Sequence, residues 1–412
     1  MMFKKKVLAA ALGALMVSGS TFAVEVAPAG KGDLLIAPLF MTGGGWTTEL
    51  KVVNTNTVDS AVAKVVFHAP GRSEEVLDFL IFLSPGDVWV GNVVTNADGS
   101  VGVSSSDDSS IVTTTGANNC PNATGTVGFD PMQARFTVPV ATGYIDIFET
   151  RMIRGLGNAP VAKSAILATY AAACNANQLI AVGDTDNVLT GTVKLSNPTN
   201  GNQLTIPMAT YANYDNFSYH SVGLLTSFAS NIANTTKGQL EDAMWASNFA
   251  IPYNNGSGQA TYASITFPTK ETYNNSAGSQ YVPFPGSPSV SYAVRDEQEN
   301  ALGTVGCSFS PCNPANILSL PNEVNLLAIQ TGGTIGGSTA GTLNTQTFTK
   351  GWVNADIQKD VSDQRSNVNY NNFGNSGSPA LVTYLIWNYS AGANSMQGSW
   401  LYAPATFTPG AR

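Results

Sequence analysis

Hydrophobic positions along this chain gather in short runs, which turn residues separate at spacings of about 8 to 12 positions. Within a run such as Thr47–Val53, apolar and polar residues alternate, and the run ends in the turn Asn54-Thr55-Asn56. Alternation with period two is typical of a strand that buries one face. Because few helical segments lie between the runs, the pattern predicts antiparallel sheets rather than a parallel α/β sheet. Further strands are predicted at Leu34–Phe40, Ala61–His68, Glu75–Leu83, Asp87–Val94, Gly143–Glu149, Thr261–Phe267, Ser289–Arg295, Val324–Ile329, Phe348–Val353 and Ala380–Trp387.

Turn, helix and loop signals lie between these strands. Ser84-Pro85-Gly86 separates Glu75–Leu83 from Asp87–Val94, and Asn96-Ala97-Asp98-Gly99 predicts a further hairpin. The best helix signal is Ala-rich Val161–Cys174 behind Pro160, followed by a shorter one at Gln239–Trp245. Long segments rich in Gly, Ser, Thr or Asn predict loops at Asp107–Thr126, Tyr273–Ser287, Gly332–Gln346 and Asn367–Ser378.

A second block with the same order of signals begins near residue 186. The strand Thr190–Ser196 precedes Asn197-Pro198-Thr199, much as Glu49–Val53 precedes Asn54-Thr55, and Leu204–Tyr211 follows as its partner strand. This echo suits two related modules. We predict a mainly β protein with two antiparallel β-sandwich modules of Ig-like type, long loops and one or two short helices. The predicted division is a signal segment at 1–23, an N-terminal module at 24–150, a helical bridge at 151–185, and a second β-rich module at 186–412 whose last strands are candidates to return to an earlier sheet.

The first residues have the pattern of a Sec signal peptide. Lys4-Lys5-Lys6 precedes a short apolar stretch at Val7–Val17, and Thr21-Phe22-Ala23 places small residues at the −3 and −1 positions of a cleavage site. The apolar stretch is about half as long as the roughly 20 residues that a membrane-spanning helix needs. We expect cleavage after residue 23, a secreted or cell-surface location, and no membrane-spanning segment in the remaining chain.

Charged residues are sparse, at 11% of the chain against roughly 25% in ordinary soluble domains. Without the three signal lysines, the chain has 16 of its 19 basic residues and all 27 acidic ones, so its formal net charge is −11. The basic residues are scattered singly, whereas a nucleic-acid surface needs clustered Lys and Arg. The sequence therefore argues against a nucleic-acid partner and stays compatible with sugars or divalent cations.

Four cysteines in an exported chain favour two disulfides. Cys307 and Cys312 enclose a tight loop with Pro311, so we pair them, and Cys120 then pairs with Cys174 by elimination. A zinc site is the rival interpretation, but neither histidine lies near either pair in the sequence.

Catalytic signatures are weak, and we predict that the protein is not an enzyme. The chain has two histidines and no Gly-x-Ser-x-Gly elbow. His68 ends a strand beside Pro70, where a surface or edge position is expected, and His220 has aromatic and hydroxyl neighbours but no adjacent carboxylate. An extracellular hydrolase that gathers His220 with a carboxylate and a hydroxyl is the weakest alternative.

Two kinds of ligand remain open. We predict no cofactor, with structural calcium as an alternative: Asp184-Thr185-Asp186-Asn187 fails the EF-hand pattern at Val188, and Asn96–Ser100 and Asp107-Asp108 are equally well explained as a turn and a loop. Aromatic rings beside amides suit stacking on a sugar, although their near-alternation favours a place in the core. These candidate glycan contacts are Tyr211, Tyr214, Phe217 and Tyr219.

Seven segments carry a resemblance that spans most of the chain. They are Gly32–Pro38, Gly44–Thr48, Val76–Phe79, Leu83–Trp89, Leu240–Trp245, Phe267–Lys270 and Gly351–Val353. In this order they resemble a group of exported bacterial proteins, largely uncharacterised, that are described as cell-surface or secreted. The resemblance implies an exterior location and an all-β construction, and it supplies no catalytic residues.

The leading hypothesis is a non-enzymatic structural protein of the bacterial exterior that self-associates as a surface layer, sheath or filament subunit. The neutral polar composition, the long loops and the missing catalytic set motivate it, and sheet edges offer unpaired backbone groups to a second copy. Val24–Phe40 is either a strand donated to a neighbour or, as we favour, an intramolecular first strand. The alternative function is a secreted adhesin module that binds glycans or a surface.

Overall fold

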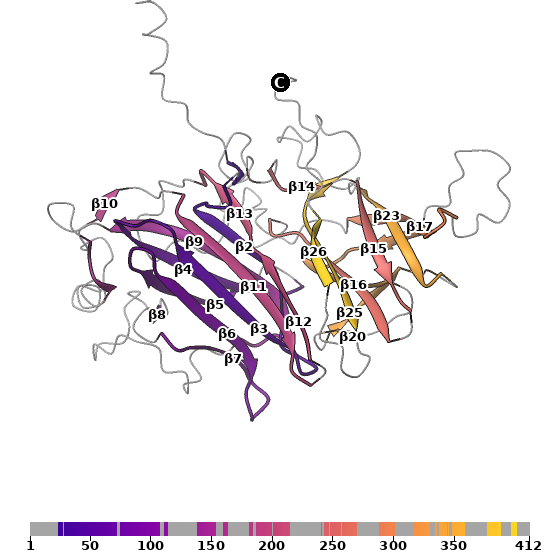
Figure 1. The fold of residues 1–412 in the computed structure, drawn as a ribbon, viewed down its shortest axis with the longest axis horizontal. Coiled ribbons are helices and arrows are strands. Elements are labelled where there is room, and N and C mark those ends of the chain that lie inside the picture. The colour runs from indigo at the N-terminus through magenta and orange to yellow at the C-terminus, as the bar shows by residue number, and fades with distance from the viewer. Residues whose placement is uncertain are drawn as a thin grey trace, which may run out of the picture.

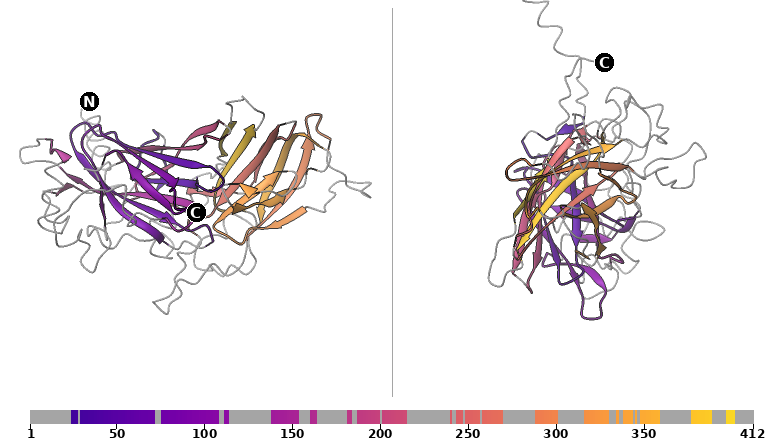
Figure 2. Two further views of the ribbon diagram at one scale, coloured as in Figure 1. Left: turned by 90° about the horizontal axis from the view of Figure 1, so that it is seen from below. Right: turned by 90° about the vertical axis from the view of Figure 1, so that its right-hand side faces the viewer.

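The structure of this protein is a computed structural model, in which almost every described element is a β-strand (Figure 1). Strands β1 to β13 gather on one side of the molecule and β15 to β26 on the other, and we call them the first and second units (Figures 1 and 2). The described residues are 24–27, 29–71, 75–107, 111–113, 138–153, 160–163, 181–183, 187–199, 201–214, 240, 243–246, 248–256, 258–269, 288–300, 316–329, 334–335, 338–343, 345, 348–358, 377–388 and 397–401.

Four larger sheets and two small ribbons contain all the described strands. Sheet 1 runs in the order β1 (Glu25–Val26), β13 (Ala209–Ala212), β2 (Leu34–Met41), β9 (Thr142–Ile153), β4 (Ser60–His68), β5 (Glu75–Leu83) and β8 (Ile111–Thr113), with β10 (Ala181–Gly183) beside β9. Sheet 2 runs β12 (Asn202–Pro207), β11 (Leu189–Asn197), β3 (Thr47–Asn54), β6 (Val88–Thr95) and β7 (Val101–Ser105). Sheet 3 runs β15 (Asn248–Asn254), β23 (Lys350–Gln358), β17 (Ser289–Asp296) and β18 (Asn316–Ser319). Sheet 4 runs β22 (Gly341–Leu343), β19 (Val324–Ile329), β16 (Gln259–Thr266), β25 (Leu381–Asn388) and β26 (Gln397–Leu401). The ribbons pair β14 (Trp245–Ala246) with β24 (Ser378–Pro379) and β20 (Thr334–Ile335) with β21 (Ser338–Thr339).

The prediction of a mainly β protein with antiparallel sheets is confirmed. The predicted strands appear with ends shifted by a few residues, and Glu75–Leu83 and Val324–Ile329 match β5 and β19 at both ends. Every pairing in the four large sheets is antiparallel except that of β19 with β22. The predicted loop Gly332–Gln346 is wrong in part, because β20, β21 and β22 lie within it.

Strands from residues 189 to 212 complete the sheets of the first unit. β11 pairs with β3 over eight residues, from Leu189 opposite Asn54 to Ser196 opposite Thr47. The expectation that residue 186 begins a second β region therefore differs from the observed pairing. The predicted strand Leu204–Tyr211 is also divided, because β12 ends at Pro207 in sheet 2 while β13 joins β2 in sheet 1. After Pro207, the N–H of Met208 still donates to the carbonyl of Gly191 at 3.0 Å, and the chain joins sheet 1 from the next residue onward.

The Ser84-Pro85-Gly86 turn does not close a hairpin. β5 belongs to sheet 1 and β6 to sheet 2, so this turn carries the chain from one sheet to the other. Gly86 has a φ of 71°, and Asp87 donates its N–H to the carbonyl of Ser84 at 3.0 Å. The Asn54 amide fixes the crossing by donating to the carbonyls of Leu83 and Ser84. The Asn96–Gly99 turn does close a hairpin, between β6 and β7.

Two hydrophobic cores explain how the units are built. One core combines residues of sheets 1 and 2 and extends to one set of residues on sheet 4, and the other combines sheets 3 and 4. On β19, Val324, Leu326 and Ala328 belong to the first core, whereas Leu327 and Ile329 belong to the second. Sheet 4 is thus buried on both faces, which explains the continuous apolar run of this strand.

Direct contacts join the two units across sheet 4. Thr266 Oγ1 donates to the carbonyl of Pro38 at 2.7 Å, and the N–H of Val324 donates to the carbonyl of Pro70 at 2.9 Å. The rings of Trp46 and Trp387 meet edge to face at a centroid distance of 5.4 Å. The junction is therefore a packed and hydrogen-bonded contact.

The predictions for the first strand and for the two helices compare differently with the structure. β2 lies between β13 and β9 with all eight residues buried, which agrees with an intramolecular first strand. The Gln239–Trp245 signal yields one helical turn, closed by the Met244 N–H on the Leu240 carbonyl, before β14 begins at Trp245. Most of the predicted helix Val161–Cys174, the signal segment 1–23, and most of the long loops lie outside the described residues.

Candidate functional site

A buried histidine and aspartate lie on the two central strands of sheet 1. Val66 pairs with Asp146 and His68 with Tyr144 across β4 and β9, so the three polar side chains share one face of the sheet. Phe67 points the other way, because it stacks on Phe79, whose ring in turn contacts Trp89 of sheet 2. The histidine and aspartate therefore face away from sheet 2.

The pair is in hydrogen-bonding distance and almost fully enclosed. His68 Nε2 lies 3.1 Å from Asp146 Oδ2, and the two side chains are 5% and 1% exposed. The imidazole stacks on the Tyr144 ring with a centroid distance of 4.5 Å and an angle of 9° between the planes. Burial raises the pKa of the Asp146 carboxyl above its ordinary value, and the hydrogen bond and charge of His68 offset only part of this effect.

A histidine held by a carboxylate is the orienting half of many general-base sites. Here, however, both side chains are buried, so a substrate cannot reach the imidazole in this conformation. The Tyr144 hydroxyl is also engaged, since it donates to the carbonyl of Pro268 from the second unit at 3.2 Å. The arrangement suits fastening of β4, β9 and the junction better than catalysis.

The expectation that His68 occupies a surface or edge position is wrong. β4 is a central strand between β5 and β9, and His68 is 4% exposed. Sequence reasoning missed the pair because strand pairing between residues 60–68 and 142–153 is not visible from local pattern. The available signal was Asp146 at an alternating position among apolar residues of a predicted strand. His220 lies outside the described residues.

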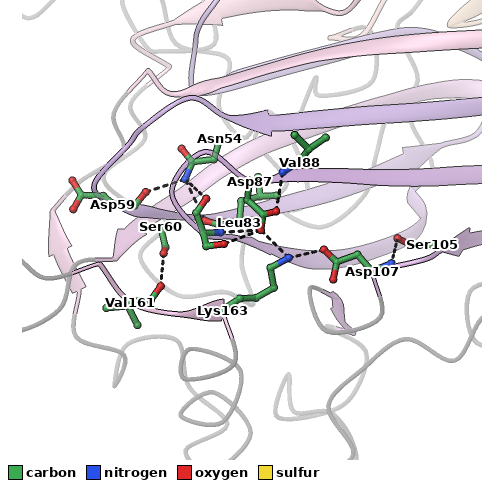
Figure 3. Close-up of polar contacts among 11 residues, drawn as sticks. Asn54, Asp59, Ser60, Leu83, Asp87, Val88, Ser105, Asp107, Val161 and Lys163 are labelled. Carbon is green, nitrogen blue, oxygen red and sulfur yellow. Dashed lines mark hydrogen bonds and ion pairs between the residues drawn. The ribbon is translucent and has the colours of Figure 1, made fainter.

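A second ionisable cluster joins Lys163 to two aspartates (Figure 3). Lys163 Nζ lies 2.7 Å from Asp87 Oδ2, at the end of the crossing turn, and 2.5 Å from Asp107 Oδ2, just beyond β7. Two residues earlier, the carbonyl of Val161 accepts a hydrogen bond from Ser60 Oγ at 3.0 Å. These contacts fasten the segment 160–163 onto the ends of strands from both sheets.

Partial burial and the ionic partners shift the pKa values of this cluster in opposite directions. For Asp87, burial raises the pKa, but Lys163 and the N–H groups of Val88 and Ser84 outweigh it, and the pKa lies below 3.8. For Lys163, burial lowers the pKa, but the two carboxylates outweigh it, and the pKa lies above 10.5. Asp87 and Lys163 are therefore both charged near neutral pH.

Within the described parts of the chain, no group of three or more His, Cys, Asp or Glu side chains is placed to hold a metal ion. Asp98 accepts hydrogen bonds from the N–H and the hydroxyl of Ser100, as expected for the turn interpretation of Asn96–Ser100. Asp108, Asp184 and Asp186 lie outside the described residues.

The candidate glycan contacts are corrected in part. Tyr211 is 0% exposed on β13, and Tyr214 is 6% exposed with its ring against Phe148. Both belong to the first hydrophobic core, so they cannot stack on a sugar in this conformation. Phe217 and Tyr219 lie outside the described residues, as do the cysteines of both predicted disulfides, Cys307 with Cys312 and Cys120 with Cys174.

A cavity of about 300 Å³ lies where the two units meet. Pro70 and Thr142 line it from the first unit, and residues of β18, β19 and β22 line it from the second. None of the lining side chains is charged. The cavity suits an apolar or neutral group better than an ion.

Comparison with known proteins adds no relationship: no family model, no curated protein and no solved structure matches this chain. Among the described residues, no helix has the length and apolarity to cross a membrane.

Proposed function

We propose that this protein is a non-enzymatic structural component of the bacterial cell exterior, where it self-associates as a subunit of a surface layer, sheath or filament. The observation that carries the proposal is the structural role of two clusters of ionisable side chains. His68 and Asp146 are enclosed between strands, and Lys163 with its two aspartates ties a segment to strand ends. In both of these clusters, side chains suited to chemistry thus hold strands and a neighbouring segment together.

The construction supports the same proposal. We propose that sheets 1 and 2, and sheets 3 and 4, form two antiparallel β-sandwich modules of Ig-like type. The two mixed cores and the alternating burial of β3 and β11 support this arrangement. The packed junction gives one elongated body, and such a body is a suitable building block for an extended assembly.

The location rests on the sequence. The pattern of residues 1–23, the sparse charge, and the resemblance to exported bacterial proteins support export through the Sec pathway and residence at the cell surface. The adhesin alternative loses the support of Tyr211 and Tyr214, because both are buried.

Association of the purified chain that begins at residue 24 tests the proposal. Sedimentation velocity over a wide concentration range, with and without calcium, is expected to show concentration-dependent association. Electron microscopy of the cell exterior is expected to show a layer or filament that a deletion strain lacks. A chain that stays monomeric at every concentration, or that turns over a substrate, contradicts the proposal.

A further inference from the structure

The edge strands of the sheets differ in how they are protected against pairing with another chain. β15 carries Pro252, and β12 ends in Pro207 and contacts β26. At β7, the carbonyl of Val101 already accepts the N–H of Val138 at 2.7 Å. Natural edges are commonly blocked by proline, charge or a covering segment. β18 has neither charge nor proline within its four residues, and β17 is its only pairing partner among the described strands.

The backbone of β18 shows which groups face outward. Leu320 donates its N–H to the carbonyl of Pro288 at 2.7 Å, so the groups of residue 320 point toward the chain that leads into β17. In an antiparallel ladder this direction alternates from residue to residue. Since Leu318 pairs with Val290 in the same register, Leu318 also bonds toward β17. The N–H and C=O of Ile317 therefore point to the edge at which no described strand pairs with β18.

The side chain of Ile317 is exposed to an unusual degree. It is 69% exposed, whereas the other exposed large hydrophobic residues of the described chain, Val26, Val58 and Val88, range from 38% to 41%. Its neighbour Leu318 packs against the second hydrophobic core. β18 thus combines a fixed backbone, outward hydrogen-bonding groups and an apolar side chain left in water.

We propose that β18 is a self-association edge, which pairs antiparallel with β18 of a second copy around a two-fold axis at Ile317. In this register Ile317 lies opposite its own copy, and the two residues exchange both of their outward backbone hydrogen bonds. Two four-stranded sheets would then continue as one sheet of eight strands. This inference rests on the proposed function and names the surface that brings two copies together.

The absence of charge along the β18 edge favours a second copy of this chain as its binding partner. The chain has a formal net charge of −8, so two copies repel each other overall, and a surface without charge is favoured for their contact. Residues 316–322 carry no charge, and the next residue, Glu323, is fully buried. The edge is therefore self-complementary, because neither the backbone pairing nor the Ile317 contact opposes like charges.

Two substitutions at Ile317 test the proposal on the purified chain from residue 24. Ile317→Lys places like charges opposite each other and should weaken dimerisation at least about tenfold. Ile317→Pro removes the outward N–H and leaves the bonds of Leu318 and Leu320 to the preceding strand in place, so it should weaken dimerisation without unfolding the sheet. Val58→Lys adds the same charge at an exposed position outside any strand and should leave association unchanged. Sedimentation velocity gives the dissociation constants, and thermal unfolding verifies the fold.

Hydrogen exchange supplies a readout independent of substitution. The Ile317 amide should exchange quickly in dilute protein and become protected as the protein associates. If the wild-type chain associates but both Ile317 variants associate equally well, with the amide unprotected, the β18 edge is overturned while the proposed function stands. If the wild-type chain remains monomeric at every concentration, the proposed function fails and this edge fails with it.

Discussion

The two ionisable clusters of the first unit have similar contact distances but different surroundings. His68 and Asp146 lie 3.1 Å apart with side chains 5% and 1% exposed, whereas Lys163 lies 2.7 Å from Asp87 with exposures of 15% and 20%. Burial raises the pKa of Asp146, and the ionic partner lowers the pKa of Asp87 in spite of its burial. Distance alone therefore does not decide what a pair contributes; access to water does.

The difference in burial also corresponds to two different structural roles of the clusters. The buried pair fixes one register between β4 and β9, because any slip of one residue would bury each group without its partner. The half-buried cluster holds a segment onto strand ends and can exchange its contacts with water at little cost. The following predictions test this division, starting with the largest effect.

Removal of one member of the buried pair should be the most damaging change. His68→Ala leaves the Asp146 carboxylate buried without its imidazole, and we expect a loss of about 3 to 5 kcal/mol in the free energy of unfolding. Chemical denaturation of the purified chain measures it. The double variant His68→Leu with Asp146→Leu should recover much of the loss, because no charge stays buried. A loss below about 1 kcal/mol for His68→Ala would show that the pair is not a fastening element.

Asn54 should come next, because its amide serves several strands at once. Its Nδ2 donates to the carbonyls of Asp59, Leu83 and Ser84, and the side chain is fully buried. Asn54→Ala takes the amide donor away from these carbonyls at a buried site, and Ser84 keeps the N–H of Asp87, so we expect a loss of about 2 kcal/mol. Asn96→Ala is the matched control, since the amide of Asn96 bonds to Ser100 in water, and it should change stability by less than about 0.5 kcal/mol. Equal losses for the two variants would contradict this role of Asn54.

The pH dependence of the two aspartates should have opposite signs. The raised pKa of Asp146 gives stability that is present below about pH 4 and is lost as the pH rises through the folded-state pKa. The lowered pKa of Asp87 gives stability that is present above about pH 4 and is lost as the pH falls through the folded-state pKa. Unfolding should be measured from acid to neutral pH. Relative to Asp146→Asn the wild-type chain should lose stability with rising pH, and relative to Asp87→Asn it should gain stability.

Much of the fold follows from local sequence, and its exceptions have physical causes. Alternation predicts β3 and β11 well because each strand buries one face. The echo between Asn54 and Asn197 is also structural, since each side-chain oxygen accepts the N–H two residues later. The two echoing strands nevertheless pair with each other in one sheet and do not mark separate modules. Local pattern identifies a strand and its turn but not its partner.

The sites were harder to predict for the same reason. The His68–Asp146 pair depends on the pairing of β4 with β9, and the Lys163 cluster joins residues 56 to 76 positions apart. Tyr211 is a residue type that suits stacking on a sugar, but it lies on β13 of sheet 1 and its side chain is fully buried. Exposure and proximity are tertiary properties, whereas the residue types alone suggested only a list of candidates.

The smallest effect should come from Lys163, and its salt dependence sharpens the comparison. Lys163→Met keeps the length of the side chain and removes the charge, so we expect a loss of less than about 1 kcal/mol at low ionic strength. The loss should shrink as salt rises, because the ion pairs are partly exposed to screening. The loss caused by His68→Ala should hardly change over the same range, since that pair is enclosed. Both should be measured by denaturation between about 0.02 and 1 M salt. If the two losses respond equally to salt, burial does not distinguish the clusters as argued.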